Sequence, residues 1–432
     1  MAPMISHRTL SLFVFAVLGC FAEDQYDMSC ENGVCYRNED EGPCMDDDRP
    51  RLYRWEPITK GYTRELELEP GKKWKMITVA NKPPVFEIPN FLSHDEVEHI
   101  KQLAIKKGLQ TSIMHFDKRL LDAKKNISGH SQGAAASFNS WDFDRDGKIT
   151  REEVKDFAEF YKYLYLSLEE VEEMIEKLDL RQFEDGGVTD DDWPTFPTAS
   201  IVSYMDTLKD QHPRHRERYS NQAWLGQGRK ADDVMKRLRA RTGKLTRLPP
   251  ELMQGSEPVQ VVRYGKDGHY NGHYDSQSIS EHPGYKCCHI VGADRVQCRL
   301  CRYATVLYYL NEVPEGGETA FPAADNETYS EEAFVREKRG DRFNLLQYCK
   351  DSRLLVKPEL GKAILWYNHF VDEDNGFLGE RDDYTIHGGC GVSKGHKWVA
   401  NNWLTAFDPS NIGSKSSFDD SEDPAHMVRD FK

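Results

Sequence analysis

The sequence predicts an α+β fold, with a double-stranded β-helix (jelly-roll) core, supporting helices and an inserted helical domain. Between residues 259 and 406, short apolar and aromatic runs alternate with turn residues, as expected of a β-rich domain. Upstream, an amphipathic helical pattern follows Ser93 and Glu96, which are spaced as a capping box. Between these regions lies an aspartate-rich loop at 142–153, flanked by helical patterns.

Length and charge limit the classes of function. At 432 residues, the chain is long enough for two or three domains, each with a core of its own. Its net charge of -15 argues against a nucleic-acid partner, because binding phosphates requires a basic surface. The short basic run 212–218 is best explained as a solvated linker.

The first 22 residues predict a cleaved signal peptide. Arg8 precedes an apolar run from Leu10 to Ala22, with small residues near the end that suit a cleavage site. This run has about 12 or 13 apolar positions, fewer than the roughly 20 that span a bilayer. We therefore expect no membrane span after cleavage, and a protein of the endoplasmic reticulum lumen or secretory pathway. An uncleaved anchor is the alternative.

Cysteine usage fits that compartment, where disulfides persist. Loss of Cys20 with the signal peptide would leave nine of the ten cysteines, so at least one thiol would be free or intermolecular. Cys298 and Cys301 have the spacing of a redox or zinc pair. No second pair follows at zinc-ribbon spacing, so we favour structural disulfides. Asn126 and Asn326 each begin an Asn-x-Ser/Thr triplet and are candidate glycosylation sites.

The chain divides into further segments by composition and pattern. Residues 23–82 are polar and charged and predict an irregular, cysteine-containing arm. Residues 83–115 predict a strand and the helix after Ser93, as the first part of the β-rich domain, and 116–195 predict the helical insert. Residues 196–408 predict the rest of the β-rich domain, and 409–432 a disordered acidic tail. Strands are expected at 259–275, 304–311, 354–357, 362–368, 384–389 and 398–406, with a helix near 231–240.

The loop 142–153 predicts a calcium site of the EF-hand type. Calcium takes six to eight oxygen ligands, and an EF-hand loop supplies them from positions 1, 3, 5, 7, 9 and 12, with glycine at position 6 for a sharp turn. Gly147 is at position 6. The ligand positions are filled by Asp142, Asp144, Asp146, the Lys148 carbonyl, Thr150 and Glu153.

A partner loop is expected at 181–192, because EF-hands usually occur in pairs. Gly186 and Asp192 match positions 6 and 12, but positions 1 and 3 are Arg181 and Phe183, which cannot donate carboxylates. We therefore expect this loop to pack against the first loop, with calcium binding there doubtful.

A metal site of another kind is indicated where the strand pattern ends in His273 and Asp275. Residues two apart in a strand point to the same side, so an imidazole and a carboxylate can bind one ion. His387 offers a third ligand, and Lys397 follows it by ten residues. Two histidines and one carboxylate leave coordination positions open, as in non-haem Fe(II) oxygenases, and the lysine can bind the far carboxylate of an oxo-acid.

Segments 260–264, 273–275, 308–311, 316–322 and 387–403 resemble the catalytic domain of prolyl 4-hydroxylases, over roughly residues 83–408. The resemblance implies hydroxylation of C4 of proline in a peptide or protein substrate, with Fe(II), 2-oxoglutarate, O₂ and ascorbate. It implies Fe(II) ligands His273, Asp275 and His387, 2-oxoglutarate contacts from Lys397, Thr319 and Tyr264, and substrate contacts from Arg302, Tyr270 and Trp403. Ordinary packing is the alternative for Thr319, Tyr264 and Trp403.

Two other functions are left open. A catalytically inactive calcium sensor on an oxygenase scaffold is one, although such a protein is expected to lack a metal ligand and none is missing here. Collagen-type substrates for the same chemistry are the other, although the sequence shows no separate helical peptide-binding domain. Because the calcium loop is inserted within the oxygenase match, we further hypothesise that calcium orders one wall of the peptide groove.

Overall fold

The computed structural model describes residues 51–112, 137–209, 211–248, 253, 256–288, 298–330 and 343–405, together with the backbone of three short strands near the N-terminus. Those strands, β1 (Met28–Glu31), β2 (Val34–Arg37) and β3 (Glu41–Pro43), form an antiparallel sheet within residues 1–49, a unit distinct from residues 50–432. Within the described ranges, none of the helices combines the length and apolar character that a bilayer span requires. The predicted signal peptide, Asn126 and the acidic tail lie outside the described residues.

The larger unit is built on a nine-stranded antiparallel sheet. Every residue of its strand Ala363–Tyr367 is buried, as expected of a strand covered on both faces. In spatial order the strands are β4 (Thr63–Glu69), β5 (Lys72–Asn81), β6 (Pro84–Ile88), β20 (Ala363–Tyr367), β16 (Arg302–Tyr309), β25 (Lys397–Thr405), β12 (Val259–Tyr264), β11 (Asn221–Leu225) and β7 (Gln110–Thr111).

A five-stranded antiparallel sheet packs on the inner face of the nine-stranded sheet. Tyr264, Leu307 and Trp366 of the large sheet share one apolar cluster with Phe321 and Val356 of the small sheet. Two sheets around a common core are consistent with the predicted jelly roll. In spatial order the small sheet contains β10 (Arg218–Tyr219), β13 (His269–His273), β23 (His387–Gly389), β18 (Thr319–Phe321) and β19 (Leu354–Val356).

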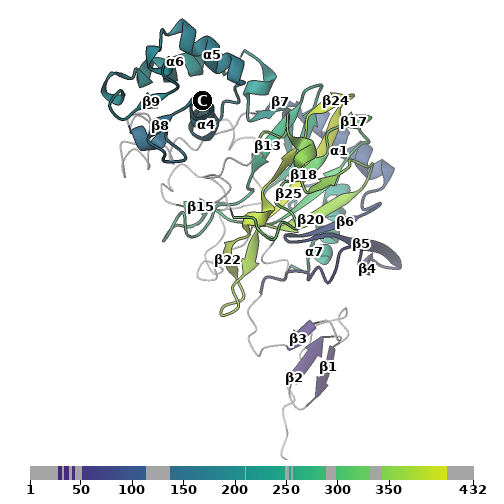
Figure 1. The fold of residues 1–432 in the computed structure, drawn as a ribbon. Helices are drawn as coiled ribbons and strands as arrows, with labels where there is room; N and C mark the ends of the chain where they lie inside the picture. The colour runs from purple at the N-terminus through teal and green to yellow at the C-terminus, as the bar shows by residue number, and fades with distance from the viewer. Residues whose placement is uncertain are drawn as a thin grey trace, which may run out of the picture. The chain divides into compact units, whose positions relative to one another are not determined.

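Two helices cover the outer face of the large sheet, α1 (His94–Lys107) and α7 (Asp233–Thr246) (Figure 1). The prediction for α1 is confirmed. Ser93 accepts a hydrogen bond from the Glu96 backbone, the Glu96 carboxylate accepts one from the Ser93 backbone, and Gly108 ends the helix at a φ of 88°. Helix α7 was expected at 231–240 and extends six residues further, to Thr246.

The prediction of an irregular arm over 23–82 is wrong for its second half, which forms β4 and β5 of the large sheet. Trp74 and Met76 in β5 are buried, whereas the lysines that alternate with them are exposed. This alternation is the pattern of a strand with one buried face. Its charged outer face gave the segment the polar composition that we interpreted as irregular.

Residues 137–208 form a helical domain with its own core. Its helices are α4 (Arg151–Lys162), α5 (Leu168–Lys177) and α6 (Thr198–Leu208), and β8 (Lys148–Ile149) pairs with β9 (Val188–Thr189). The expected boundary at 195 is wrong, because Ile201 and Met205 of α6 are buried in this core. We had interpreted Pro197 as a break, but it immediately precedes the helix, where proline is tolerated.

The remaining elements are short. Antiparallel pairs are formed by β17 (Glu315–Gly316) with β24 (Val392–Lys394) and by β21 (His369–Val371) with β22 (Leu378–Arg381), and β14 (Lys286–Cys288) pairs in parallel with β15 (Cys298–Leu300). The 3₁₀ helices are η1 (Phe138–Ser140), η2 (Arg181–Phe183), η3 (Trp193–Thr195), η4 (Pro213–His215), η5 (Cys349–Asp351) and η6 (Asp383–Thr385).

Among the residues that the structure describes, two disulfides join segments of the larger unit, Cys287 to Cys301 and Cys349 to Cys390. The expectation of structural disulfides is confirmed for these pairs, and Cys301 is bonded to Cys287 instead of to Cys298 of the same C-x-x-C segment. Asn326 is only 8% exposed, and its side-chain oxygen accepts a hydrogen bond from the Thr328 hydroxyl. This burial disfavours a glycan on Asn326, whose glycosylation stays a prediction.

Candidate active site

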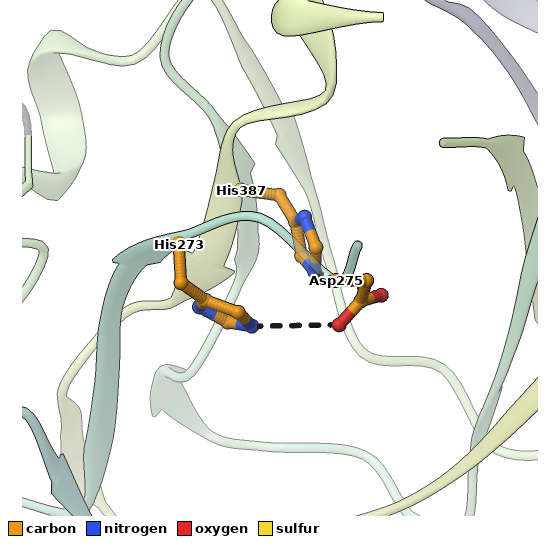
Figure 2. Close-up of side chains that lie close together, drawn as sticks. All are labelled: His273, Asp275 and His387. Carbon is orange, nitrogen blue, oxygen red and sulfur yellow. Dashed lines mark ion pairs between the residues drawn. The ribbon is translucent and has the colours of Figure 1, made fainter. Parts of the chain in front are cut away.

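Strand pairing brings the two predicted histidine ligands together. His273 at the end of β13 and His387 at the start of β23 are direct partners across the small sheet. The Asp275 carboxylate lies beside both rings, with Oδ1 3.7 Å from Nε2 of His273 and Oδ2 3.4 Å from Nε2 of His387. Figure 2 shows the three side chains converging on one point. The sequence predicted all three members of this cluster.

Backbone carbonyls determine which imidazole nitrogen faces Asp275. Nδ1 of His273 lies 2.8 Å from the carbonyl oxygen of Asn271, and Nδ1 of His387 lies 2.8 Å from that of Thr385. Because a carbonyl oxygen only accepts hydrogen bonds, each Nδ1 donates its proton there and each Nε2 keeps its lone pair. Both lone pairs are therefore available to a metal ion, with the rings held in orientation.

Burial sets the charge of the cluster. It lowers the pKa of His387 to about 4, against the opposing charge of Asp275, so this imidazole is neutral near pH 7. Burial alone would raise the pKa of Asp275, but the two histidines and Arg302 hold it well below its ordinary value. Thus, at neutral pH, an ionised carboxylate faces a neutral imidazole, which is the state that binds a divalent cation.

The donor set fits Fe(II). The three ligand atoms lie within 4.8 Å of one another and belong to two imidazoles and one carboxylate. This combination occupies one face of the ion and leaves the other positions for an oxo-acid and O₂.

The predicted lysine lies on the same side of the small sheet as the histidine cluster. Lys397, at the start of β25, is the register partner of Tyr264 and is 2% exposed. A Cβ added at Gly389 would lie 3.6 Å from Lys397 Nζ, and Gly389 is two residues from His387 in β23. Residues two apart in a strand face the same way, so the ammonium and the His387 ring share one side.

Lys397 is suited to bind an anion. In the described part of the chain, no carboxylate lies within ion-pair distance of Lys397 Nζ. Burial lowers the pKa of Lys397 to about 7, although the charge of Glu318 acts in the opposite direction. A buried ammonium without a counter-ion is costly, so a dicarboxylate that reaches this point would supply the missing charge.

Tyr309 belongs to the same region, and the sequence analysis missed it. Its hydroxyl donates a 2.7 Å hydrogen bond to Thr319, and its ring centroid lies 5.9 Å from Lys397 Nζ. Tyr308 has the same side chain but faces the outer side of the sheet, where its hydroxyl is 2.7 Å from that of Thr242. The direction of the pleat separates these two tyrosines, and the sequence alone did not reveal it.

The predicted substrate residues form two groups. Tyr270 stacks on His273, with ring centroids 3.6 Å apart. The Arg302 guanidinium carbon lies 3.5 Å from the centroid of the Trp403 ring, and Arg302 also forms a bidentate ion pair with Glu257. The indole nitrogen of Trp403 is buried without a hydrogen-bond partner among the described residues. Contact of these residues with a peptide stays a prediction.

The acidic loop of the helical domain places three carboxylates around one point. Ligand atoms of Asp142, Asp144 and Asp146 lie within 4.8 Å of one another. Gly147 has a φ of 87°, which glycine adopts readily, and its backbone nitrogen donates to Asp142 Oδ2. Glu153 is wholly buried at the start of α4, and its Oε2 accepts hydrogen bonds from the backbone and hydroxyl of Thr150.

Asp142 carries the observation that is most specific for a cation. Its Oδ1 is buried, and within the described ranges no donor reaches it. A buried carboxylate oxygen without a hydrogen-bond partner is rare unless a cation or water satisfies it. The acidic loop therefore fits Ca²⁺, which takes carboxylate and carbonyl oxygens.

The second loop has the expected packing role. Ile149 and Val188 are partners across β8 and β9, and Asp192 Oδ2 accepts hydrogen bonds from the backbone and hydroxyl of Thr189. Phe183, at the third loop position, is buried in the helical core and offers no ligand oxygen.

Known proteins with similar sequences support the assignment from geometry. Residues 259–405 match the family model of the 2OG-Fe(II) oxygenase superfamily. The transmembrane prolyl 4-hydroxylase of Mus musculus is 37% identical over 391 residues, covering 87% of this chain and 76% of the relative. That of Homo sapiens is 36% identical over 387 residues, covering 89% and 75%. The chain belongs to the transmembrane prolyl 4-hydroxylase family.

Membership of the transmembrane prolyl 4-hydroxylase family makes the chain an enzyme of the 2-oxoglutarate- and Fe(II)-dependent oxygenase class. The cofactors of this class are Fe(II), 2-oxoglutarate and O₂. A more distant match is the structure of the viral collagen prolyl hydroxylase from Paramecium Bursaria Chlorella virus-1 with 2OG. It is 23% identical and covers 44% of this chain and 80% of the viral chain, with a TM-score of 0.28.

Proposed function

We propose that this protein uses Fe(II), 2-oxoglutarate, O₂ and ascorbate to hydroxylate C4 of proline in a peptide or protein substrate, and that its helical insert binds Ca²⁺. One observation carries the catalytic proposal. The cluster of His273, Asp275 and His387 faces the same side as the buried ammonium of Lys397. The cluster supplies ligands for iron, and the ammonium supplies a positive charge for the distal carboxylate of an oxo-dicarboxylate.

The roles of the residues follow from their chemistry. Bound Fe(II) with 2-oxoglutarate would supply the oxidant that transfers one oxygen atom of O₂ to a substrate carbon. Asp275 would balance part of the metal charge, and His273 and His387 would add neutral ligands. Lys397 would pair with the distal carboxylate of 2-oxoglutarate, which selects against monocarboxylic oxo-acids. Hydroxyls of Thr319, Tyr309 and Tyr264 are candidate donors to the same carboxylate.

The substrate proline would meet aromatic rings beside the iron ligands. Tyr270 stacks on His273 and offers a flat surface on which a pyrrolidine can pack. Trp403 and Arg302 offer a second surface, held in place by the ion pair with Glu257. We propose that the peptide chain crosses these residues, which would position one carbon near the metal.

The decisive test of the oxygenase proposal measures 2-oxoglutarate turnover with Fe(II) and ascorbate. We expect His387→Ala to abolish turnover, because the metal loses one of three ligands. His396→Ala is the matched control, because His396 is exposed and lies nine residues away in the chain. Equal decarboxylation by the unmodified protein and His387→Ala would refute the proposal, and absence of turnover in both would favour the inactive calcium sensor. Mass spectrometry of hydroxyproline in candidate peptides, including collagen-type ones, identifies the substrate class.

The calcium proposal is tested separately. Calorimetric titration with Ca²⁺ should show one site in the unmodified protein. Glu153→Gln should lose it, because the buried Glu153 supplies the position-12 carboxylate. Glu152→Gln is the control, since Glu152 is exposed and next to it in the same helix. Unchanged binding in Glu153→Gln would remove the calcium site from the proposal.

We also propose that the protein works in the lumen of the endoplasmic reticulum or along the secretory pathway. The disulfides Cys287–Cys301 and Cys349–Cys390 support an oxidising compartment. Fractionation of expressing cells, with protease protection of the intact organelle, tests this location.

A further inference from the structure

A continuous chain of hydrogen bonds ends on the carboxylate of Asp275. The Thr305 hydroxyl in β16 lies 2.7 Å from Asp275 Oδ2. The side-chain amide nitrogen of Asn368 lies 3.0 Å from the same hydroxyl, and the Trp366 indole nitrogen lies 2.9 Å from the amide oxygen of Asn368. None of the four side chains is more than 3% exposed, so water does not compete for these bonds.

The chemistry of the donors fixes the direction in which each of these hydrogen bonds is donated. An indole nitrogen only donates, so the group of Asn368 that faces Trp366 must be its oxygen. The Asn368 nitrogen then faces Thr305 and also the carbonyl oxygen of Arg302, 3.1 Å away. Because an amide nitrogen donates and never accepts, the Thr305 hydroxyl accepts from Asn368. Its own proton is therefore directed to Asp275.

The same tryptophan also contacts a histidine ligand. The Trp366 ring lies edge-on to the His387 ring, with centroids 4.7 Å apart. Strand register supports this arrangement, because Thr305 and Trp366 are direct partners across β16 and β20. Trp366 thus packs against one iron ligand and, through Asn368 and Thr305, orients another.

We propose that Thr305, Asn368 and Trp366 are positioning residues for the iron site, and that the Thr305 hydroxyl holds the Asp275 carboxylate in its metal-binding orientation. This inference rests on the proposed function, because it requires a metal at His273, Asp275 and His387. A rotating carboxylate would have to be ordered each time that a metal bound. A carboxylate fixed by a buried donor is already ordered, so metal affinity is higher.

Measurements of metal affinity test the proposed positioning role without any catalytic assay. The metal-free protein is titrated with Co(II), followed by its visible absorption bands and by calorimetry. We expect Thr305→Val to weaken Co(II) binding by about 10- to 100-fold and to change the absorption bands, the range found when outer-sphere partners of metal ligands are removed. Thr305→Ser keeps the hydroxyl and should stay within about threefold of the unmodified protein.

Two further variants separate positioning from general damage. Thr242→Val removes another buried threonine hydroxyl, which contacts Tyr308 on the outer side of β16, and should leave Co(II) affinity unchanged. Trp366→Phe keeps an aromatic ring beside His387 but removes the indole donor. It should weaken Co(II) binding in the same direction as Thr305→Val, and it serves as the test if Thr305→Val does not fold.

The outcomes are distinct. If Thr305→Val, or Trp366→Phe in its place, binds Co(II) with the affinity and absorption of the unmodified protein, the positioning role is wrong while the oxygenase proposal stands. Equal losses of Co(II) affinity in Thr305→Val and Thr242→Val would also overturn the positioning role. Absence of Co(II) binding by the unmodified protein would instead refute the metal site itself, and the proposed function with it.

Discussion

The hydroxyl of Tyr165, in the helical insert, donates a hydrogen bond to the buried carboxylate of Glu217. The backbone carbonyl of Glu217 accepts a 2.9 Å hydrogen bond from the backbone nitrogen of Asn271, which lies in β13 two residues before the proposed iron ligand His273. A second contact joins the same segments, since the Tyr165 backbone nitrogen donates to the His215 carbonyl. The insert is therefore connected through residues 215–217 to the strand that carries the proposed metal ligand His273.

This connection gives the first prediction, on pH and stability. Burial raises the pKa of Glu217 to about 7, although the hydrogen bond from Tyr165 lowers it in part. The folded protein then retains a proton on Glu217 between pH 4.5 and 7 that the unfolded chain has lost. Stability must therefore fall as pH rises through this window, by about 3 kcal/mol, and level off above it.

Glu217→Gln removes that titration. Urea unfolding at pH 5 and pH 8 should show a larger decrease in the free energy of unfolding for the unmodified protein than for Glu217→Gln. The difference between the two proteins isolates Glu217 from other carboxylates. The same decrease in both would mean that Glu217 is not protonated in the folded state at pH 5.

The second prediction concerns calcium and the peptide groove. If calcium orders the insert, and the Tyr165 contact transmits that order to β13, calcium should lower the KM for a substrate peptide. Glu153→Gln should abolish this effect of calcium, and Tyr165→Phe should reduce it while leaving calcium binding intact. Turnover of a peptide identified by hydroxyproline mass spectrometry, with and without calcium, provides the measurement. A KM that is insensitive to Glu153→Gln would contradict the coupling.

Several features of this site could be predicted from sequence because they depend on short-range rules. His273 and Asp275 share a face through the two-residue repeat of a strand, and Asp142, Asp144 and Asp146 come together within one short loop. Helix α1 was predicted from its capping box, which is also local. In each case the information lies within a dozen consecutive residues.

The features that were missed depend on long-range register and on the direction of the pleat. Tyr309 and Tyr308 differ only in the side of β16 that they face. The Thr305 hydroxyl donates a hydrogen bond to Asp275 from β16, a strand of the large sheet that is distant from Asp275 in the sequence. No local sequence pattern reveals this contact. Strands β4 and β5 were missed because their exposed faces are charged, so the average composition hid the alternation.

The third prediction concerns the disulfide formed by Cys390, which follows the proposed iron ligand His387 closely in the sequence. Cys390 lies three residues after His387 and is bonded to Cys349 across a 41-residue separation. Replacing both by serine should lower the free energy of unfolding by about 2–5 kcal/mol, because the unfolded chain gains freedom. Urea unfolding under non-reducing conditions measures this decrease in the free energy of unfolding. The Cys287–Cys301 double serine variant is the comparison, and its smaller loop of 14 residues should give a smaller loss.

The fourth prediction is a proton linkage in 2-oxoglutarate binding. Burial lowers the pKa of Lys397 to about 7, so a growing fraction of the free protein carries a neutral amine as pH rises above 7. A bound dicarboxylate favours the ammonium form, so binding must take up a proton. The affinity for 2-oxoglutarate should therefore fall above pH 7, by up to about tenfold per pH unit, and change little below it.

Calorimetry with Mn(II) in place of iron, at pH 6.5, 7.5 and 8.5, measures this dependence. Lys397→Arg keeps a permanent charge and should bind with little change between these pH values, while Lys397→Met should raise the Kd for 2-oxoglutarate at all of them, by about 30-fold or more at pH 6.5. Succinate is a useful second ligand, because it keeps both carboxylates without the oxo group. An affinity of the unmodified protein that does not change from pH 6.5 to 8.5, matching that of Lys397→Arg, would show that Lys397 is already charged before the ligand arrives.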